Sequence, residues 1–369
     1  MKILYLSNIP SPYRVEYFNQ LGKQCELTVI FEKNSSDERD ASWSEYKFQY
    51  FKGIILQGIK IRTDTAICPQ VIKYLTNEKY DHIIVTNFSS PTGLIAIAWM
   101  KRKKIIYSVE ADGAFKNEKK GVKEKIKSWA ISSAELCFST SNALDDYFIK
   151  YGAKRQQIRR YPFSSVCQER LLKNPPSREQ KDFLKTKLNI SESNIIITVG
   201  AFIPRKGFDI LLRAIPNIKK NEEWGIYIIG GKITSEYADI IKKEKIKNVH
   251  FVEFCRKNEL SDFYQMADLF VLPTREDIWG LVINEALANA LPVITTDRCV
   301  AGVELIKNNY NGLIVKADDT EDLVKGINEL ISRKSEWEKM SFNSLRTAKK
   351  YTIEEMVQSH MKVWNNTSM

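Results

Sequence analysis

Short apolar runs alternate with stretches of helical periodicity along almost the whole chain, and this alternation restricts the fold more than any other feature. In the first half, the predicted strands are 2–7, 26–31, 82–87, 105–109, 136–140 and 158–161. Predicted helices of about 10–15 residues separate most of them. Strands joined by helices form βαβ crossovers, so neighbouring strands run parallel and helices cover both faces of the sheet. The sequence therefore predicts an α/β fold.

A second series of the same units follows a polar stretch at 175–177, Pro-Pro-Ser. Its predicted strands are 195–199, 226–229, 249–254, 269–272, 293–296 and 313–315. Because a chain of 369 residues exceeds the size at which one core keeps growing, we expect two doubly wound, Rossmann-like domains that face each other across a cleft. The predicted boundaries are a first domain at 1–165, a linker at 166–191, a second domain at 192–350, and a helix at 351–369 that packs back toward the first domain.

The net charge of +11 belongs entirely to residues 1–200, because residues 201–369 hold equal numbers of basic and acidic side chains. Many of the lysines lie in 101–104 and 116–127. Solvated helix faces account for many such clusters. Nucleic acid is another generic partner, but the sequence has no zinc, RRM-like or homeodomain signature, and we expect no nucleic-acid binding. An anionic membrane surface is favoured, with Trp99, Ile126, Trp129 and Ile131 available for shallow insertion.

The sequence features that report on cellular location agree with one another. No run approaches the roughly 20 apolar residues that a membrane span needs, and the start of the chain lacks the pattern of a secretory signal. The six cysteines have neither metal-type nor disulfide-type spacing, which is typical of reduced thiols. We therefore expect a cytoplasmic protein that is peripheral at the inner face of the cytoplasmic membrane.

The segment 269–288 joins a buried strand to a helix through a charged turn. The first turn of a helix presents unpaired backbone N–H groups and a partial positive charge, which favours a bound anion. Gly280, Leu281 and Val282 occupy this position, and Asp277 and Glu285 stand eight residues apart across the turn. Taken alone, Glu285 is more readily interpreted as a favourable charge at the helix start, and Asp277 as a turn residue.

A second turn of similar character follows the strand at 195–199. Gly200 and Gly207 enclose the adjacent cations Arg205 and Lys206, and a solvated basic loop is as good an interpretation of this segment alone. Together with the helix start at Gly280, Lys206 is placed to clamp a diphosphate from two sides. The sequence has no Asp-x-Asp cluster at a strand end, the pattern that would indicate a metal site.

Several motifs in the second half resemble those of bacterial glycosyltransferases of family four. These are VGAFIPRKGFD at 199–209, ADLFVLPT at 267–274, DIWGLVINEALA at 277–288 and YNGLIV at 310–315. The resemblance is strongest over 192–332 and weaker over 1–165. It implies the GT-B fold, retention of anomeric configuration and catalysis without a metal. It also assigns Glu285 to the ribose hydroxyls of a nucleotide-sugar and Lys206 to its diphosphate, with Asp277 in place of the family's first glutamate.

Two positions depart from the family pattern. The family's usual phosphate-binding arginine falls on Ala201, so Arg205 would have to replace it. The family often has a histidine in the first domain, where this chain reads VEADG, so Glu110 or Asp112 would have to serve. The chain's three histidines (His82, His250 and His360) are interpreted as structural.

These arguments assign candidate residues to three roles, and none to a metal. The catalytic residues are Asp277, Lys206, Arg205, Glu110 and Asp112. The donor-binding residues are Gly200, Lys206, Gly230, Phe254, Cys255, Gly280, Leu281, Val282 and Glu285. The acceptor-binding residues are Pro12, Tyr13, Arg14 and Gly113.

The resulting hypothesis is transfer of a hexose-type sugar from a UDP- or GDP-linked donor, without a further cofactor, to a hydroxyl of a lipid-linked or polysaccharide acceptor. Assembly of capsule, O-antigen or another surface glycan is the expected setting. Two alternatives stay open at the level of sequence. The protein is a nucleotide-sugar epimerase in one, and in the other it is a non-catalytic partner subunit that binds a nucleotide-sugar.

Overall fold

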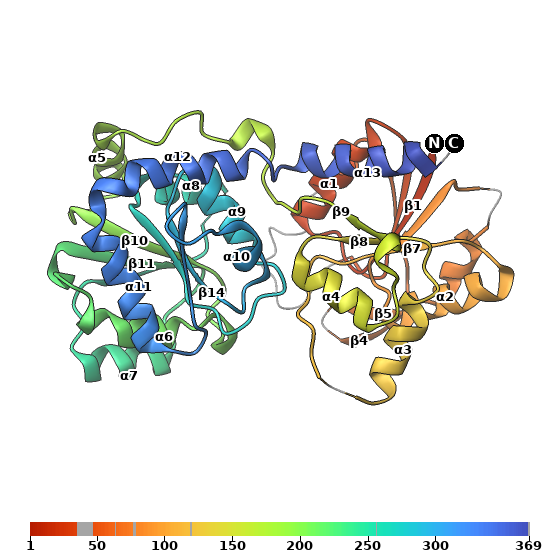
Figure 1. Ribbon diagram of the computed structural model, residues 1–369, viewed down its shortest axis with the longest axis horizontal. Coiled ribbons are helices and arrows are strands. Elements are labelled where there is room, and N and C mark those ends of the chain that lie inside the picture. Colours follow the sequence, from red (N-terminus) through yellow and green to blue (C-terminus); the bar gives the residue numbers. More distant parts are fainter. Residues whose placement is uncertain (35–46, 63, 77–78, 119, 256, 368–369) are drawn as a thin grey trace. The chain divides into compact units, whose positions relative to one another are not determined.

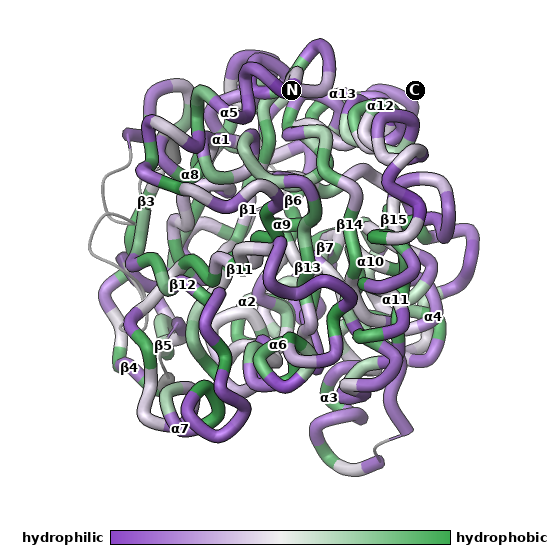
Figure 2. Tube along the Cα trace, turned by 90° about the vertical axis from the view of Figure 1, so that its left-hand side faces the viewer, coloured by the Kyte–Doolittle hydropathy of each residue, from purple (hydrophilic) through white to green (hydrophobic). Residues whose placement is uncertain are grey.

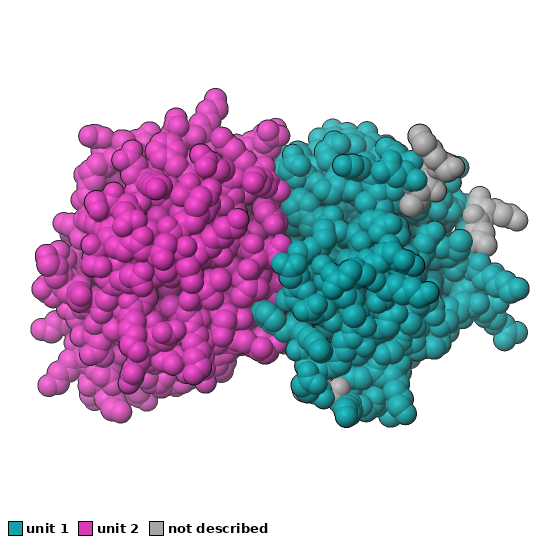
Figure 3. Space-filling model, viewed as in Figure 1, with its two compact units in different colours: residues 1–165, 352–369 teal, residues 166–351 magenta. Residues whose placement is uncertain are grey.

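The computed structural model describes residues 1–34, 47–62, 64–76, 79–118, 120–255 and 257–367. The chain divides into two compact units, which Figure 3 colours separately. Unit 1 comprises Met1–Ser165 and Thr352–Met369, and unit 2 comprises Val166–Tyr351. The segment 166–191, expected as a linker, lies within unit 2.

Unit 1 is built on a parallel sheet with the strand order β3-β2-β1-β6-β7-β8-β9 (Figure 1). Its strands are β1 (Lys2–Ser7), β2 (Glu26–Phe31), β3 (Lys52–Ile55), β6 (His82–Val85), β7 (Ser108–Glu110), β8 (Cys137–Ser139) and β9 (Ile158–Arg160). Continuous apolar runs such as Ile3 to Leu6 become strands that are buried on both faces, as expected for a parallel sheet. The β3 strand and an antiparallel hairpin of β4 (Ile59–Arg62) and β5 (Thr65–Ile67) were not predicted.

The structure describes five α-helices in unit 1, and two of them begin at a serine cap. They are α1 (Pro12–Gly22), α2 (Pro91–Lys103), α3 (Val122–Ile131), α4 (Asn142–Lys150) and α13 (Ile353–Thr367). The Ser90 and Ser141 side chains accept hydrogen bonds from amides in the first turns of α2 and α4. The α13 helix, from the end of the chain, packs on α1. A 3₁₀ helix at Pro69–Tyr74 ends in extended backbone at Leu75.

Unit 2 contains a parallel sheet with the order β12-β11-β10-β13-β14-β15. Its strands are β10 (Asn194–Val199), β11 (Trp224–Ile229), β12 (Val249–Val252), β13 (Leu269–Leu272), β14 (Val293–Thr296) and β15 (Gly312–Val315). The chain proceeds outward from β10 to β12 and then returns to place β13 on the other side of β10. The order of the strands therefore reverses between β10 and β13, which is where doubly wound sheets bind ligands.

The helices of unit 2 pack around this sheet. They are α5 (Arg178–Lys187), α6 (Phe208–Ala214), α7 (Ser235–Glu244), α8 (Lys257–Met266), α9 (Leu281–Ala288), α10 (Val300–Leu305), α11 (Thr320–Ser332) and α12 (Trp337–Ala348). The α6 helix ends at Ala214, because Pro216 lacks an amide hydrogen and the chain continues as a 3₁₀ turn. Figure 2 colours most strands hydrophobic and many of the connecting turns hydrophilic. Among the described residues, no helix is both long and apolar enough to span a membrane.

The first prediction concerns Gly207, which has φ +69° and lies against the loop after β13. A Cβ atom at this position would overlap the carbonyl oxygen of Pro273. We expect Gly207→Ala to lower the free energy of unfolding of unit 2 by roughly 2–4 kcal/mol, because a positive φ and a displaced loop both cost stability. Urea denaturation followed by circular dichroism measures the change.

The matched control is Lys220→Gly, at an exposed position with φ +53°. Its unfolding free energy should stay within about 1 kcal/mol of the parent, since glycine adopts this conformation without strain. A Gly207→Ala protein as stable as the parent would show that the two loops do not need their close approach.

Candidate active site

Two loops follow the C-terminal ends of neighbouring strands in the unit 2 sheet, at the point where the strand order reverses. The β10 strand runs into 200–207 and the β13 strand runs into 273–280, and the two strands are parallel neighbours. The backbone carbonyl of Arg205 joins these loops. It accepts hydrogen bonds from the Thr274 hydroxyl at 2.9 Å and from the Arg275 amide at 2.8 Å. The basic loop and the carboxylate loop thus form one structural element.

The Asp277 carboxylate lies between the two cations of the basic loop. Its Oδ2 is 2.5 Å from Nζ of Lys206, and its Oδ1 is 3.3 Å from Nη1 of Arg205. The Lys206 and Asp277 side chains are only 13% and 11% exposed, whereas that of Arg205 is 45% exposed. Sequence reasoning assigned all three to catalysis, and the structure brings them together.

Arg275 was missed by the sequence analysis, although it holds the two loops together. Its guanidinium donates to both carboxylate oxygens of Asp209 on α6, at 2.8 and 2.9 Å, and to Asp318 at 2.7 Å. Burial disfavours the charged form of Asp209, but hydrogen bonds from Arg275 and Arg213 outweigh it, and the pKa of Asp209 is lowered. A bidentate pair of this kind is geometrically specific. Its partners lie 66 residues apart, so the loop sequence alone gives no signal for it.

The start of α9 is held rigidly from both sides. Gly280, the N-cap residue, has φ +100°, and a Cβ atom there would lie 2.7 Å from the sulfur of Cys299. The Cys299 thiol donates to the Trp279 carbonyl at 3.2 Å, and the Trp279 indole N–H donates to Asn284 at 2.7 Å. Because glycine has no side chain, none caps the following amides of Leu281 and Val282.

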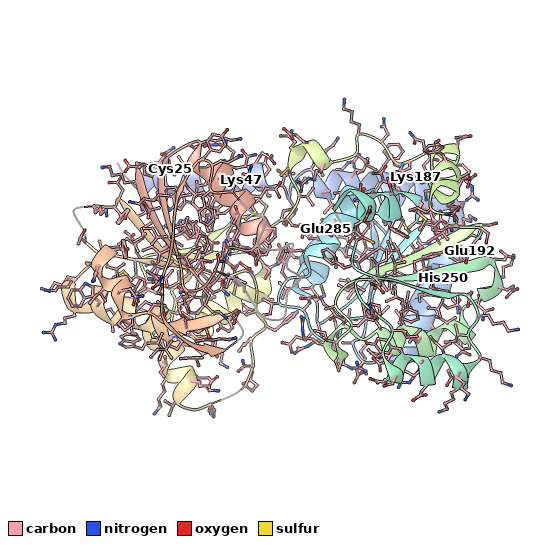
Figure 4. All side chains as sticks on the ribbon, turned by 180° about the vertical axis from the view of Figure 1, so that it is seen from behind. Cys25, Lys47, Lys187, Glu192, His250 and Glu285 are labelled. Carbon is pink, nitrogen blue, oxygen red and sulfur yellow. The ribbon has the colours of Figure 1, made fainter. Side chains whose placement is uncertain are left out.

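Glu285 lies half-buried within α9, where Figure 4 labels it. The hydroxyl of Tyr264, on α8, donates to its Oε2 at 3.1 Å. Burial, together with the charge of Glu285, raises the pKa of Tyr264 well above its usual value, so Tyr264 stays a neutral donor. This contact orients the carboxylate that the sequence analysis assigned to the sugar of a nucleotide.

The remaining donor candidates lie in loops at the same edge of the sheet. Gly230 ends β11 with φ +125°, and a Cβ atom there would collide with the carbonyl oxygen of Gly200. The close packing of these two loops therefore requires a glycine at position 230. A Cβ atom at Gly200 would lie 3.5 Å from the Cδ and Cε atoms of Lys206, which is ordinary van der Waals distance. Phe254, which is 51% exposed, and half-buried Cys255 follow the edge strand β12.

In unit 1 the structure differs from one expectation. Glu110, a catalytic candidate expected to face a ligand, is completely buried at the end of β7. Its Oε1 is 2.6 Å from Nη1 of Arg14, and the other guanidinium nitrogen of Arg14 contacts Asp112. The hydroxyl groups of Tyr5 and Tyr161 also donate to Glu110. Glu110 and Arg14 therefore stabilise the interior of unit 1.

Other unit 1 candidates lie nearer the surface. Asp112, whose side chain is 28% exposed, accepts a hydrogen bond from the Tyr13 hydroxyl at 3.0 Å. Pro12, the first residue of α1, is half-buried, and Gly113 is buried. The structure thus brings Tyr13 and Asp112 together, and Arg14 links Asp112 to Glu110.

His360 also belongs to the buried cluster around Glu110, although sequence reasoning did not connect the two residues. It comes from α13, and its Nε2 is 3.2 Å from Oε2 of Glu110. Its Nδ1 is 2.8 Å from the Met356 carbonyl, and its ring stacks on Phe138 at 4.7 Å. No local pattern reveals a pair separated by 250 residues.

The other two histidines lie against aromatic rings. His250 contacts Glu192 at 2.5 Å and stacks on Tyr227, and Figure 4 shows His250 and Glu192 together. His82 stacks on Trp364, and burial lowers its pKa. In the described parts of the chain, no group of three or more His, Cys, Asp or Glu side chains is arranged to hold a metal ion.

Comparison with known proteins identifies the fold. Residues 180–347 match the family model described as glycosyl transferases group 1. The structure of Anabaena HepE in complex with UDP superposes with a TM-score of 0.81, at 16% identity, over 99% of this chain and 100% of that one. The chain has the GT-B fold that such structural neighbours share.

Curated relatives are also similar to the chain. An uncharacterized glycosyltransferase of Methanocaldococcus jannaschii is 27% identical over 233 residues, which is 60% of this chain and 63% of that protein. The N,N'-diacetylbacillosaminyl-diphospho-undecaprenol alpha-1,3-N-acetylgalactosaminyltransferase of Campylobacter jejuni is 22% identical and aligned over 79% of each chain. The chain therefore spans less than two thirds of the length of the Methanocaldococcus relative. The comparisons support a relationship to glycosyltransferases.

The second prediction tests the buried cluster. Burial opposes the ionisation of Glu110, but the charge of Arg14 and the hydrogen bond from His360 outweigh it and lower the pKa of Glu110 to about 2. We expect Glu110→Gln to destabilise unit 1 by about 3 kcal/mol at pH 7, because it leaves Arg14 without its buried partner. Urea denaturation measures this value.

The pH dependence follows from the direction of that shift. The folded pKa lies below the ordinary value of 4.5, so the ion pair stabilises fully above about pH 5, and its contribution is lost as the pH falls toward 2. The difference between the parent and Glu110→Gln should therefore shrink between pH 5 and pH 3. In the control Glu26→Gln, an exposed residue of unit 1, the change should stay below about 0.5 kcal/mol. A pH-independent difference would contradict an ionised Glu110.

Proposed function

We propose that the protein is a glycosyltransferase that moves a hexose-type sugar from a UDP- or GDP-linked donor to an acceptor hydroxyl, with retention of configuration. The observation that carries this proposal is the joint placement of Lys206, Arg205 and the start of α9 at the switch point of unit 2. Cations and helix-end amides at such a point suit a diphosphate. The match to glycosyl transferases group 1 over 180–347 supports the same conclusion.

The diphosphate is the leaving group in this reaction, and it gains negative charge as the sugar departs. Lys206 and Arg205 approach one carboxylate from two sides, so both cations are directed to the same place. This geometry supports the replacement of the arginine missing at Ala201 by Arg205. Preorganised cations and amides stabilise a departing anion without a metal, and we therefore propose a metal-independent reaction.

On the donor side, Glu285 is proposed to accept hydrogen bonds from the ribose hydroxyls. Its orientation by Tyr264 at 3.1 Å supports this role. Asp277 is proposed to meet the transferred sugar, and Gly200, Gly230, Phe254 and Cys255 line the nucleotide.

The acceptor is proposed to bind to unit 1, beside Pro12, Tyr13, Asp112 and Gly113. Because Glu110 is buried, Asp112 is the better candidate for a carboxylate that contacts substrate. A lipid-linked acceptor is supported by the Campylobacter relative, whose name gives an undecaprenol-linked substrate. The proposed setting is cytoplasmic assembly of a surface glycan such as capsule or O-antigen.

An anionic membrane surface is the proposed partner of unit 1. Val122, Ile126 and Trp129 lie four and three positions apart on α3 and are 73%, 38% and 39% exposed. Such spacing places them on one helix face. Lysines surround this face, and Nζ of Lys101 lies 4.4 Å above the Trp129 ring. Ile131, which was also expected to insert, is completely buried in the core of unit 1. Lys119, which sequence reasoning included among these lysines, lies outside the described residues. An apolar face with a lysine border suits shallow insertion among anionic lipids.

The third prediction is enzymatic. Lys206→Ala should lower kcat/KM for sugar transfer by about 10²–10³-fold, because it removes a donor aimed at the leaving group. Glu285→Gln should depress transfer mainly through a higher KM for the donor. The assay is release of UDP or GDP from a panel of nucleotide-sugars in the presence of an acceptor.

The control for this assay is Lys187→Ala, which removes a lysine that is remote on α5 and paired with Asp262 (Figure 4). It should retain full activity.

The same panel discriminates the alternative functions, since interconversion of the donor indicates an epimerase and binding without turnover indicates a partner subunit. Binding appears as a thermal shift, because a ligand at 100 times its Kd adds about 2.7 kcal/mol of stability. Full activity of both Lys206→Ala and Glu285→Gln would show that the assignment of the active site is wrong.

The fourth prediction concerns the membrane. Ile126→Asp removes an apolar contact and adds a negative charge, so partitioning onto vesicles that contain phosphatidylglycerol should fall by about tenfold. Co-sedimentation measures the partition coefficient. Ile59→Asp is the control, because Ile59 is 75% exposed on the β4–β5 hairpin and should leave partitioning within about twofold. An equal fall in the partition coefficient of both variants would show that α3 is not the membrane-binding face.

A further inference from the structure

The Lys206–Asp277 pair has a consequence for ligand binding. In the protein without ligand, each oxygen of the Asp277 carboxylate faces one cation, with 2.5 Å to Lys206 and 3.3 Å to Arg205. Phosphate oxygens accept hydrogen bonds from the same N–H donors. The carboxylate therefore occupies the place that an anionic ligand of Lys206 would take.

The backbone of Asp277 is held in position, so the carboxylate cannot leave with a moving loop. The Asp277 amide donates to the Arg298 carbonyl at 2.9 Å, and its own carbonyl accepts from the Val300 amide at 3.2 Å. On the opposite side, the Arg205 carbonyl is bound by Thr274 and Arg275. Only rotation of its side chain is open to Asp277 when an anion arrives. Because the pair is largely shielded from water, its charges are screened less than those on the surface.

The repulsion from Asp277 differs between substrate and product. In a nucleotide-sugar, the terminal phosphate is esterified by the sugar and has no second ionisation. In a free nucleoside diphosphate this group titrates with a pKa of about 6, so at pH 7.5 the product carries about one more negative charge. A fixed carboxylate beside Lys206 disfavours the more highly charged product more strongly.

We infer that Asp277 is an internal counterion that selects the intact nucleotide-sugar over the free nucleoside diphosphate and so promotes product release. This inference rests on the proposed function, since it assumes that Lys206 binds the diphosphate. It adds a second role for Asp277, which is distinct from any contact with the transferred sugar. Free enzyme returns to the ion-paired state once the product leaves.

The test compares dissociation constants by isothermal titration calorimetry at pH 7.5. The ligands are UDP, GDP and the nucleotide-sugar that the enzyme accepts, each with the parent and with Asp277→Asn. The variant should bind the free nucleoside diphosphate about tenfold more tightly, as expected for the loss of one like-charge contact. The nucleotide-sugar should gain less, because its diphosphate carries about one negative charge fewer, so the ratio of the nucleotide-sugar Kd to the nucleoside diphosphate Kd should rise.

Two controls isolate the position of the charge. Asp277→Glu keeps the charge and should retain a ratio within about threefold of the parent. Glu276→Gln removes an exposed negative charge one residue away and should change neither constant by more than about twofold.

The outcomes separate the two ideas. If the parent binds these ligands and Asp277→Asn binds the nucleoside diphosphate no more tightly, the counterion role is wrong and the proposed function stands. If neither protein binds any nucleotide at millimolar concentration, both are wrong. A tighter product complex with slower turnover supports the inference.

Discussion

The pairing of β10 with β13 is the constraint on which the candidate active site depends. Parallel neighbours deliver their following loops to one edge, and these loops are then joined through the Arg205 carbonyl and the Arg275–Asp209 pair. Hydrogen bonds at this edge convert two flexible glycine-containing turns into one rigid element. Lys206 and Asp277 acquire their mutual position from that element, since neither turn alone would determine it.

The two units use charged side chains in opposite ways. In unit 1, Glu110 is completely buried and paired with Arg14 and His360, so its charge stabilises a packed interior. In unit 2, Lys206 and Asp277 remain partly exposed at a loop edge, where an incoming anion can compete for the lysine. The position of a carboxylate after a parallel strand thus does not by itself predict whether it contacts a ligand. Burial decides whether it is part of the core or part of a site.

Much of the fold could be predicted because the signals are local. Apolar runs and helical periodicity predicted most elements to within a few residues, as with the strands of unit 2. The β4–β5 hairpin and α10 were missed, because both are short and carry little periodicity. In the site, the loops around Lys206 and Asp277 were predicted from glycine and charge spacing, but Arg275 was not. The assignment of Glu110 to a ligand-facing role also differed from its burial.

The sequence by itself determined most of the secondary structure, the parallel α/β architecture and the two turns that hold Lys206 and Asp277, because these depend on neighbours within about a dozen residues. Tertiary structure alone decided which polar side chains meet. Glu110 finds His360 across 250 positions, and Arg275 finds Asp209 across 66. Such pairs form because burial penalises an isolated charge and rewards whichever partner the packing of strands and helices brings near, and that outcome is encoded in the whole fold.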